Sequence, residues 1–458
     1  MTKENKMGTM SVGKLLVEVS LPIMISMFIQ ALYNIVDSFF VSQLNEQAFT
    51  AVSLAFPIQN TIIGISVGTG VGINALLSRS LGEKNTHQAH LAAENGIILT
   101  IMYAIIFFIF GVFGPEAYYR SQTSDPSIIA YGVDYVSIVT KVSIGIFMQI
   151  TMERLLQATG KSILTMIMQI CGALTNMIMD PILIFGLFGF PKMGVKGAAI
   201  ATVMGQLLAA TLGIIFERKF NPEVKIHALR FDLKTVGKIY AIGVPSIILT
   251  SLTGVTVYFF NKILSRFSDT ALAAYGAYFK MQSFVFMPAF GLVNGMVPIL
   301  AYNYGAAKPQ RARDTIKYSL MAGTGIMFVG FLVFQIFPDQ LLRIFNASEE
   351  LLEIGRTTLK IISISFLFAG VTVVSASVFQ ALGNGFLSLC TTFIRLIVVL
   401  LPTAYFLSFK GDVNLVWWAY PIAEVADIIT CVLFLKKFAY RKINELDDEN
   451  YENLEATA

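Results

Sequence analysis

The sequence predicts an all-α polytopic membrane protein, with twelve transmembrane helices arranged as two parallel-repeat bundles of six. Three observations support this fold class. Of the 458 residues, 55% are hydrophobic and only 14% are charged, whereas charged residues make up about 25% of a typical soluble domain. The mean hydropathy is +0.68, and apolar runs long enough to cross a bilayer recur along the whole chain. The second half of the chain also repeats the first.

The individual spans are read from apolar runs of about 18 residues or more. Several runs exceed the roughly 20 residues that a bilayer requires, so tilted or kinked helices are expected. The twelve expected spans lie near residues 14–43, 48–80, 92–114, 128–157, 162–188, 196–217, 234–262, 272–303, 316–338, 350–381, 385–409 and 414–437.

The orientation in the membrane follows from the lysine and arginine residues. The first ten residues are polar and the first apolar run is too long for a signal peptide, so the chain is expected to start in the cytoplasm. With that start, the inside segments hold 21 of the 33 basic residues and the outside segments hold 9. Because basic loops stay inside, we expect a multi-pass protein of the cell membrane with both termini in the cytoplasm.

An internal repeat organises the chain. A shift of 223 residues pairs Pro22 with Pro245, Gln59 with Gln282, and the motif QATG at residues 157–160 with QALG at residues 380–383. Six spans per half is an even number, so both halves enter the membrane in the same direction. We expect an N-lobe over residues 1–216, a C-lobe over 239–440 and a cytoplasmic tail over 441–458, with the two lobes enclosing a V-shaped central cleft.

Residues 217–238 form the longest basic stretch between the lobes. They are predicted to be a cytoplasmic linker, either irregular or helical on the surface of the anionic leaflet. A nucleic-acid partner is not expected, because no aromatic-rich segment accompanies the basic residues.

Two spans carry polar stripes. Residues 20–41 are apolar enough to cross a bilayer, yet their polar side chains recur at helical spacing on one face, and so do those of the fifth span. Each stripe ends in an aspartate, and Pro181 after the second removes a backbone donor. The stripes comprise Ser26, Gln30, Tyr33, Asn34 and Asp37 in the first span, and Gln169, Ala173, Asn176 and Asp180 in the fifth.

A carboxylate at membrane depth costs about 2.5–3.5 kcal/mol on insertion scales, and its default interpretation is a site for an ion or a proton. Together with Tyr33, Asn176 and Thr202 of the sixth span, the two aspartates form either an oxygen-rich Na⁺ site or a carboxylate pair that carries a proton. The competing interpretation is that hydrogen bonds between helices neutralise each aspartate. At the 223-residue shift Asp37 and Asp180 correspond to Phe260 and Thr403, which confines the acidic site to the first half.

The second half contains other charged residues within its spans. Their expected role is mutual neutralisation across helices rather than contact with a substrate. They are Lys280, Arg395, Glu424 and Asp427.

Several kinds of site are not expected. The three cysteines lie in apolar runs and serve packing, the histidines lie in loops without partner ligands, and no Walker motif is present. We therefore expect no enzyme activity and no cofactor other than the coupling ion. Polar and methionine side chains are expected to line a substrate cavity, namely Gln30, Asn34, Met27, Gln169, Gln59 and Gln282.

The motifs SLPIMI, YNIVDSFFV, LLQATG, NMIMDPILIFG, GVKGAAIATV and QALGNG together resemble the MATE (multidrug and toxic compound extrusion) family, in its DinF-like prokaryotic branch. The resemblance covers nearly the whole chain. It implies a secondary antiporter that exports organic, often cationic, drugs and toxic compounds in exchange for Na⁺ or H⁺ by alternating access, and that confers antibiotic resistance.

The resemblance also implies roles for particular residues. Tyr33, Asp37, Asn176, Asp180 and Thr202 match the cation or proton coupling site of the family's N-lobe. If sodium is the ion, Asp37, Asp180, Asn176 and Thr202 are its expected ligands.

Pro22 matches a proline at which the first helix is proposed to bend. Other branches also carry acidic residues on the seventh and tenth helices. This chain has Phe260 and no acid within residues 360–381, which argues against a C-lobe cation site.

Two alternatives remain open. The first is a flippase for lipid-linked saccharides, which more spans and an arginine-rich cavity would favour. The second is an intramembrane enzyme, which would need a nucleophile and a base at one depth. The expected partners are small organic molecules and the lipid bilayer, and the expected state is a monomer.

Overall fold

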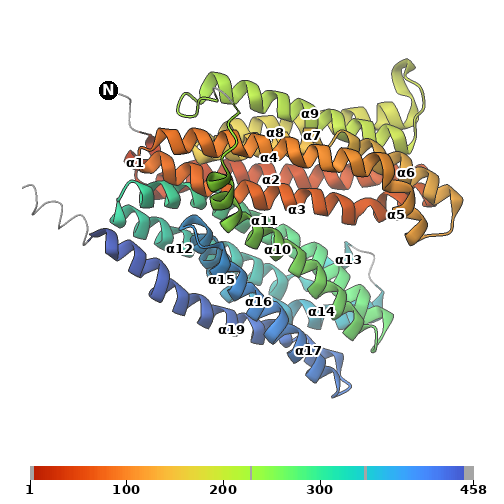
Figure 1. Ribbon diagram of the computed structural model, residues 1–458. Coiled ribbons are helices and arrows are strands. Elements are labelled where there is room, and N and C mark those ends of the chain that lie inside the picture. The colour runs from red at the N-terminus through yellow and green to blue at the C-terminus, as the bar shows by residue number, and fades with distance from the viewer. Residues whose placement is uncertain (1–4, 227–228, 345–347, 448–458) are drawn as a thin grey trace, which may run out of the picture. The chain divides into compact units, whose positions relative to one another are not determined.

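The computed structural model describes residues 5–226, 229–344 and 348–447, and in these ranges every regular element is helical (Figure 1). The first half contains α1 (Lys6–Thr9), α2 (Val12–Ser42), α3 (Glu46–Gly82), α4 (Thr86–Phe113), α5 (Pro115–Gln122), α6 (Pro126–Lys141), α7 (Ile144–Ala158), α8 (Ser162–Phe185), η1 (Leu187–Gly189) and α9 (Val195–Phe220). The second half contains α10 (Leu233–Leu264), α11 (Asp269–Gly305), α12 (Pro309–Ile336), α13 (Pro338–Arg343), α14 (Glu349–Ser363), α15 (Phe366–Ala381), α16 (Gly385–Phe393), η2 (Ile394–Leu400), α17 (Leu401–Ser408), α18 (Val413–Val416), α19 (Ala419–Phe434) and η3 (Leu435–Tyr440).

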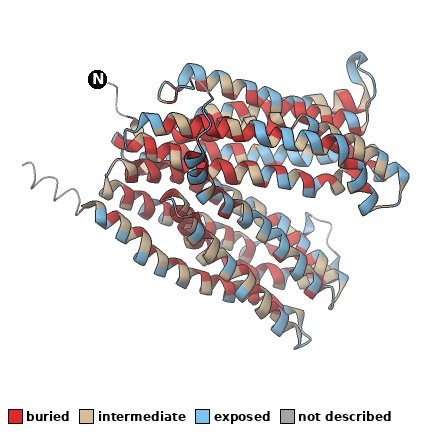
Figure 2. Cartoon of the chain, in the orientation of Figure 1, coloured by how far each residue is buried: buried red, intermediate tan, exposed pale blue. Residues whose placement is uncertain are grey.

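The helices have the length and apolar composition of membrane spans. Within the described residues, ten helices are long and apolar enough to cross a bilayer, or up to twelve if each of two bent pairs counts as one span. Large apolar side chains such as Ile105, Ile106 and Phe108 of α4 are exposed, as expected for a surface that faces lipid rather than water. Figure 2 shows exposed and buried faces alternating along the helices. The all-α membrane fold is confirmed.

Two predicted spans are broken rather than straight. The span predicted at 128–157 consists of α6 and α7, which are bent by 45°, and the span predicted at 350–381 consists of α14 and α15, which are bent by 50°. At both breaks the backbone makes short-range bonds of the 3₁₀ type, from Ser143 N to Thr140 O at 3.2 Å and from Ser365 N to Ile362 O at 3.0 Å. Such a turn changes the helix direction, although the apolar run continues through it.

The internal repeat is visible in the helix boundaries. Shifting α3 and α4 by 223 residues reproduces both ends of α11 and α12, and shifting α8 reproduces the ends of the combined segment Gly385–Ser408. The next connection is five residues shorter in the second half, so Val195 at the start of α9 corresponds to Val413 at the start of α18, a shift of 218. The predicted repeat is confirmed.

The chain forms two compact units, which are described separately. We call Ile25–Ser80 with Asn85–Ile239 the N-unit, and Met1–Met24, Leu81–Lys84 and Tyr240–Ala458 the C-unit. The N-unit core includes Tyr119, Tyr135 and Phe147, and the C-unit core is built around Phe260 and Trp417. The predicted lobe boundaries stay a prediction, and residues 448–458 of the predicted tail lie outside the described residues.

The chain start belongs to the C-unit through specific hydrogen bonds. The Arg311 side chain donates to the carbonyl oxygens of Met7 at 2.9 Å and Met10 at 2.7 Å, and the Ser20 hydroxyl donates to the Leu292 carbonyl at 3.2 Å. The N-unit share of α2 therefore begins at Ile25, three residues after Pro22.

The segment before α10 is irregular. Residues 221–226 and 229–232 contain no helix, so the expectation of a surface helix in the linker is wrong for these residues. The fully buried Asn95 of α4 holds the backbone instead, donating to the Arg230 carbonyl at 3.1 Å and accepting from the Asp232 N–H at 2.9 Å. Hydrogen bonds from the hydroxyl and N–H groups of Thr235 lower the pKa of the Asp232 carboxyl below its ordinary value.

Candidate functional site

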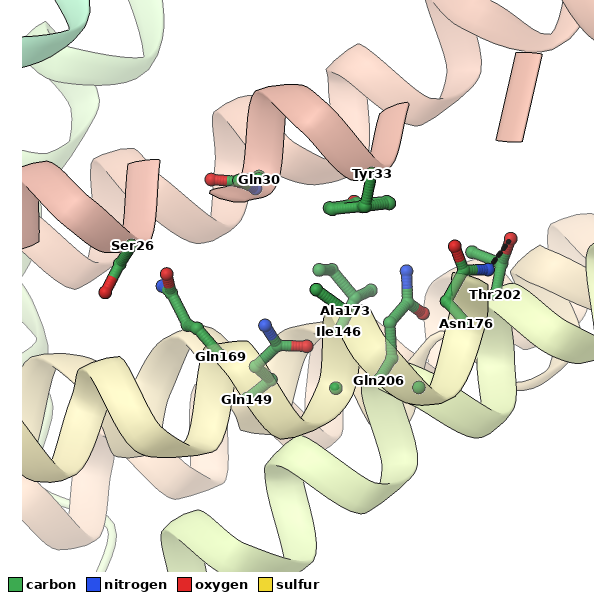
Figure 3. Close-up of a pocket in the computed structure, with 12 residues that line it drawn as sticks. Ser26, Gln30, Tyr33, Ile146, Gln149, Gln169, Ala173, Asn176, Thr202 and Gln206 are labelled. Atoms are coloured by element: carbon green, nitrogen blue, oxygen red, sulfur yellow. Dashed lines mark hydrogen bonds between the residues drawn. The ribbon is translucent and has the colours of Figure 1, made fainter. Parts of the chain in front are cut away.

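A polar cavity lies inside the N-unit between α2, α7, α8 and α9 (Figure 3). Its volume is about 40 Å³, which is enough for a few waters or one small ion but far below the several hundred Å³ of a drug-sized site. Amide side chains dominate the polar part of its wall. The lining residues are Ser26, Gln30, Tyr33, Ile146, Gln149, Gln169, Gly172, Ala173, Asn176, Thr202, Gly205 and Gln206.

The close approach of α8 and α9 places two of the predicted site residues together. A Cβ added at Gly205 would lie 2.5 Å from the Gly172 carbonyl oxygen and 3.2 Å from the Asn176 Cβ, so only glycine fits there. Across this contact Asn176 Nδ2 approaches Thr202 Oγ1 at 3.4 Å, as the dashed line in Figure 3 marks. Asn176 is 3% exposed, and its Oδ1 has no hydrogen-bond partner.

The two aspartates meet at one end of this cavity. Asp37 of α2 and Asp180 of α8 lie beside each other, and their charges interact. Asp180 is fully buried, and neither its Oδ1 nor its Oδ2 has a hydrogen-bond partner, nor does the buried Oδ1 of Asp37. Tyr33 interacts electrostatically with both carboxyl groups. The structure thus brings together Tyr33, Asp37, Asn176, Asp180 and Thr202.

Such an arrangement is poised to accept positive charge. Carboxylate oxygens without donors at membrane depth require a proton or a cation. Among the described residues, no group of three or more histidine, cysteine, aspartate or glutamate residues is placed to hold a metal ion. An ion bound here would therefore depend on neutral oxygens, such as Asn176 Oδ1, as well as on the two carboxylates.

Tyr135 of α6 is a site residue that the sequence analysis did not identify. It is buried, accepts a hydrogen bond at 3.0 Å from Gln59 Nε2, and interacts electrostatically with Asp37, Asp180 and Thr202. The signal in the sequence was its phenol within an apolar span, but nothing in the span's polar pattern points toward the aspartates. Gln59 thus acts on the site through Tyr135 and does not itself line the cavity.

Changing Tyr135 to phenylalanine is expected to slow ion-driven dye efflux by about tenfold. The change removes a hydroxyl beside two carboxyl groups, and a hydrogen bond to a charged group contributes about 1.5–3 kcal/mol. Efflux from proteoliposomes measures the effect. Tyr131→Phe, one turn away on α6, is the matched control, and equal efflux by both variants would remove Tyr135 from the site.

At the opposite end of the stripe, Gln169 connects the cavity to a buried carboxylate. Gln169 Nε2 donates to Glu153 Oε2 at 2.5 Å, and Gln157 Nε2 donates to Glu153 Oε1 at 2.8 Å. Because Gln169 must donate to a carboxylate, its amide oxygen faces away, and this oxygen has no partner. The polar track on α8 therefore joins Glu153 at one end to Asp180 at the other.

Comparison with known proteins identifies the family. A sequence profile of the MatE family matches residues 22–182 and 244–406, one segment in each repeat. The chain belongs to the MatE family.

Individual relatives agree with this assignment. The "Multidrug export protein MepA" of Staphylococcus haemolyticus is 27% identical over 422 residues, which is 90% of this chain and 91% of the relative. The "FAD transporter" of Shewanella oneidensis is 25% identical over 434 residues, which is 92% of this chain and 93% of the relative. The solved structure titled "Outward-facing conformation of a multidrug resistance MATE family transporter of the MOP superfamily" matches with a TM-score of 0.89 and 21% identity, covering 98% and 99% of the two chains.

Other residues predicted for this MatE protein lie outside the cavity wall. Asn34 is exposed, and Met27 is half-buried on α2 without lining the cavity. Gln282 is half-buried on α11 of the C-unit. Pro22 is buried inside α2, which continues as one helix through it. Bending at Pro22 stays a prediction.

The C-unit of this MatE protein has a different interior. Phe260, the counterpart of Asp37, is fully buried, with its ring centroid 4.8 Å from that of Tyr275 and 5.2 Å from that of Tyr420. Arg395 pairs with Glu424 at 3.1 Å and with Asp427 at 3.3 Å. The predicted mutual neutralisation is confirmed for these three charges, whereas Lys280 is exposed on α11.

Proposed function

We propose that this MatE protein is a secondary antiporter that exports organic, often cationic, compounds in exchange for Na⁺ or H⁺. The observation that carries the proposal is the buried pair Asp37 and Asp180, whose oxygens lack hydrogen-bond donors. A structural pair would be satisfied by its neighbours, whereas a site that alternately binds and releases a cation must leave oxygens available.

The coupling ion binds at the inner end of the N-unit cavity in this proposal. For sodium, the ligands are Asp37, Asp180, Asn176 and Thr202. For a proton, the carboxyl pair shares the charge and Tyr33 and Tyr135 stabilise it. Both readings use the same residues, so the ion is decided by experiment rather than by the ligand set.

The composition of the cavity favours export of organic compounds over the flippase alternative. A flippase for lipid-linked saccharides is expected to have a cavity rich in arginine, but the residues lining this cavity are mainly amide, hydroxyl and small apolar side chains. The names of the relatives that export multiple drugs support the same substrate class. A drug-sized substrate needs a wider cavity than about 40 Å³, so transport involves a second, more open arrangement of these helices.

The proposal places a monomer in the cell membrane, with both termini in the cytoplasm. The basic residues of the linker and of the segment Lys308–Lys317 then face the anionic leaflet, which stabilises this orientation.

Reconstitution with separate ion gradients tests the proposed function. Purified protein in liposomes is loaded with ethidium, and efflux is recorded under an imposed sodium gradient and, separately, under a proton gradient. One of the two gradients is expected to accelerate efflux severalfold, and the Asp37→Asn protein is expected to respond to neither. Efflux that responds to no gradient, or equally with and without Asp37, would contradict the antiport proposal.

A further inference from the structure

The charged cluster in the C-unit is buried and well connected. Glu424 and Asp427 lie one turn apart on α19 and are 4% and 3% exposed. Arg395 reaches them from η2, a π-helical turn, and the Thr372 hydroxyl of α15 donates to Glu424 Oε1 at 2.5 Å. The phenol groups of Tyr278 and Tyr420 interact with the same charges. No part of the N-unit site explains this cluster.

The internal repeat relates the cluster to the N-unit cavity. The shift of 223 residues carries Gly172 onto Arg395 and Gln149 onto Thr372, and the shift of 218 that applies to α9 carries Thr202 onto Tyr420 and Gln206 onto Glu424. Gly172, Gln149, Thr202 and Gln206 all line the N-unit cavity. The counterparts of four cavity residues thus form the charged cluster.

The contacts within each unit support this equivalence independently. In the N-unit, a Cβ at Gly172 would lie 2.9 Å from the Gly205 carbonyl oxygen and 3.0 Å from the Ala209 Cβ. Asp427 is the counterpart of Ala209 at the 218-residue shift. In the C-unit, Arg395 contacts this same Asp427. The same helix faces therefore meet in both units, with Gly172 facing Ala209 in one and Arg395 facing Asp427 in the other.

We propose that the C-unit contains a counterpart of the N-unit cation cavity that is permanently filled by the guanidinium group of Arg395. The guanidinium takes the place of a bound cation, and Glu424 and Asp427 supply the carboxylates that hold it. With glycine at position 395, as in the N-unit, the site is open and binds a free guanidinium ion. Because the C-unit cation is covalently attached, exchangeable cations bind in the N-unit alone.

Rescue by a free ion tests the proposal. The full-length protein with Arg395→Gly is purified, and its thermal unfolding midpoint is measured with about 10 mM guanidinium chloride and with potassium chloride at the same ionic strength. Guanidinium at this concentration is far below denaturing levels. It is expected to raise the midpoint of the variant by on the order of 2 °C and to leave the midpoint of the unmodified protein unchanged.

Two further variants make the test specific. Arg395→Gly combined with Glu424→Gln and Asp427→Ala reproduces the N-unit residues at all three positions and is expected to lose the response to guanidinium. Arg395→Gly with Asp427→Ala keeps Glu424 as a single carboxylate, leaves less unpaired charge and is expected to retain a response, which covers the case in which the single variant does not fold.

The proposal is overturned by three results. These are no guanidinium response in either carboxylate-bearing variant, an equal response in the variant without carboxylates, or failure of guanidinium to restore folded protein for either of the first two. Since the readout is thermal stability, the result is independent of whether the protein exports organic compounds.

Discussion

Replacing Asp37 by asparagine is expected to abolish ethidium efflux while leaving the protein folded. Asparagine has nearly the same shape as aspartate, so the packing of α2 against α8 is retained. It removes the negative charge next to Asp180, however, and with it the ability of the pair to bind and release one positive charge. Efflux from proteoliposomes under the effective ion gradient is the measurement.

The structure also predicts how the variant behaves in unfolding. One buried carboxyl group beside another is costly because both cannot be ionised comfortably. Removing one charge is therefore expected to leave the thermal midpoint unchanged or slightly higher, even though transport is lost.

Asp134→Asn is the matched control, because Asp134 is a carboxylate of the same unit that pairs with Lys196 at 3.3 Å on an exposed surface. It is expected to retain full efflux. Loss of efflux in both variants, or retained efflux with Asp37→Asn, would show that the carboxyl pair does not couple transport.

The fold was predictable because it depends on patterns that are local or periodic. Apolar runs predict spans, and the pairing of Pro22 with Pro245 predicts a repeat that the helix boundaries reproduce. The bends at residues 142–143 and 364–365 were not predictable from hydropathy, since the apolar run continues across each. They occur at nearly equivalent places in the two halves, so comparing the halves at these positions was the available signal.

The candidate site was partly predictable for a similar reason. The stripes on α2 and α8 end in Asp37 and Asp180 because helical spacing aligns polar residues on a single face. Tyr135 comes from a third helix, and its approach to the aspartates depends on how α6 packs, which no spacing rule within α6 specifies. Pairing of Arg395 with Glu424 follows from the cost of buried charge, but its equivalence to the cavity requires the change of shift from 223 to 218 after α8.

Replacing Gly205 by valine is expected to reduce both stability and transport. A Cβ at this position would lie 2.5 Å from the Gly172 carbonyl oxygen, which is backbone and cannot move unless α8 moves away from α9. Overpacking of this kind costs about 1–3 kcal/mol, and membrane helices that approach through small residues depend on that approach.

The loss of transport is expected to exceed what reduced stability explains. Moving α8 away from α9 separates Asn176 from Thr202, whose side chains are already 3.4 Å apart, and it changes the wall of the cavity. Folded protein recovered in detergent is therefore expected to show efflux reduced by about tenfold or more, consistent with displacement of site groups by about 1 Å.

Gly325→Val on α12 is the matched control, because no atom lies within 4 Å of a Cβ built there and the residue is exposed. Both variants add the same side chain to a membrane helix, so any general effect of valine in lipid appears in both. Thermal midpoints and dye efflux are measured on the two proteins in parallel. If Gly205→Val matches Gly325→Val in both measurements, then close packing of α8 against α9 does not hold the cation site together, and the ligand geometry must depend on α2 and α6 instead.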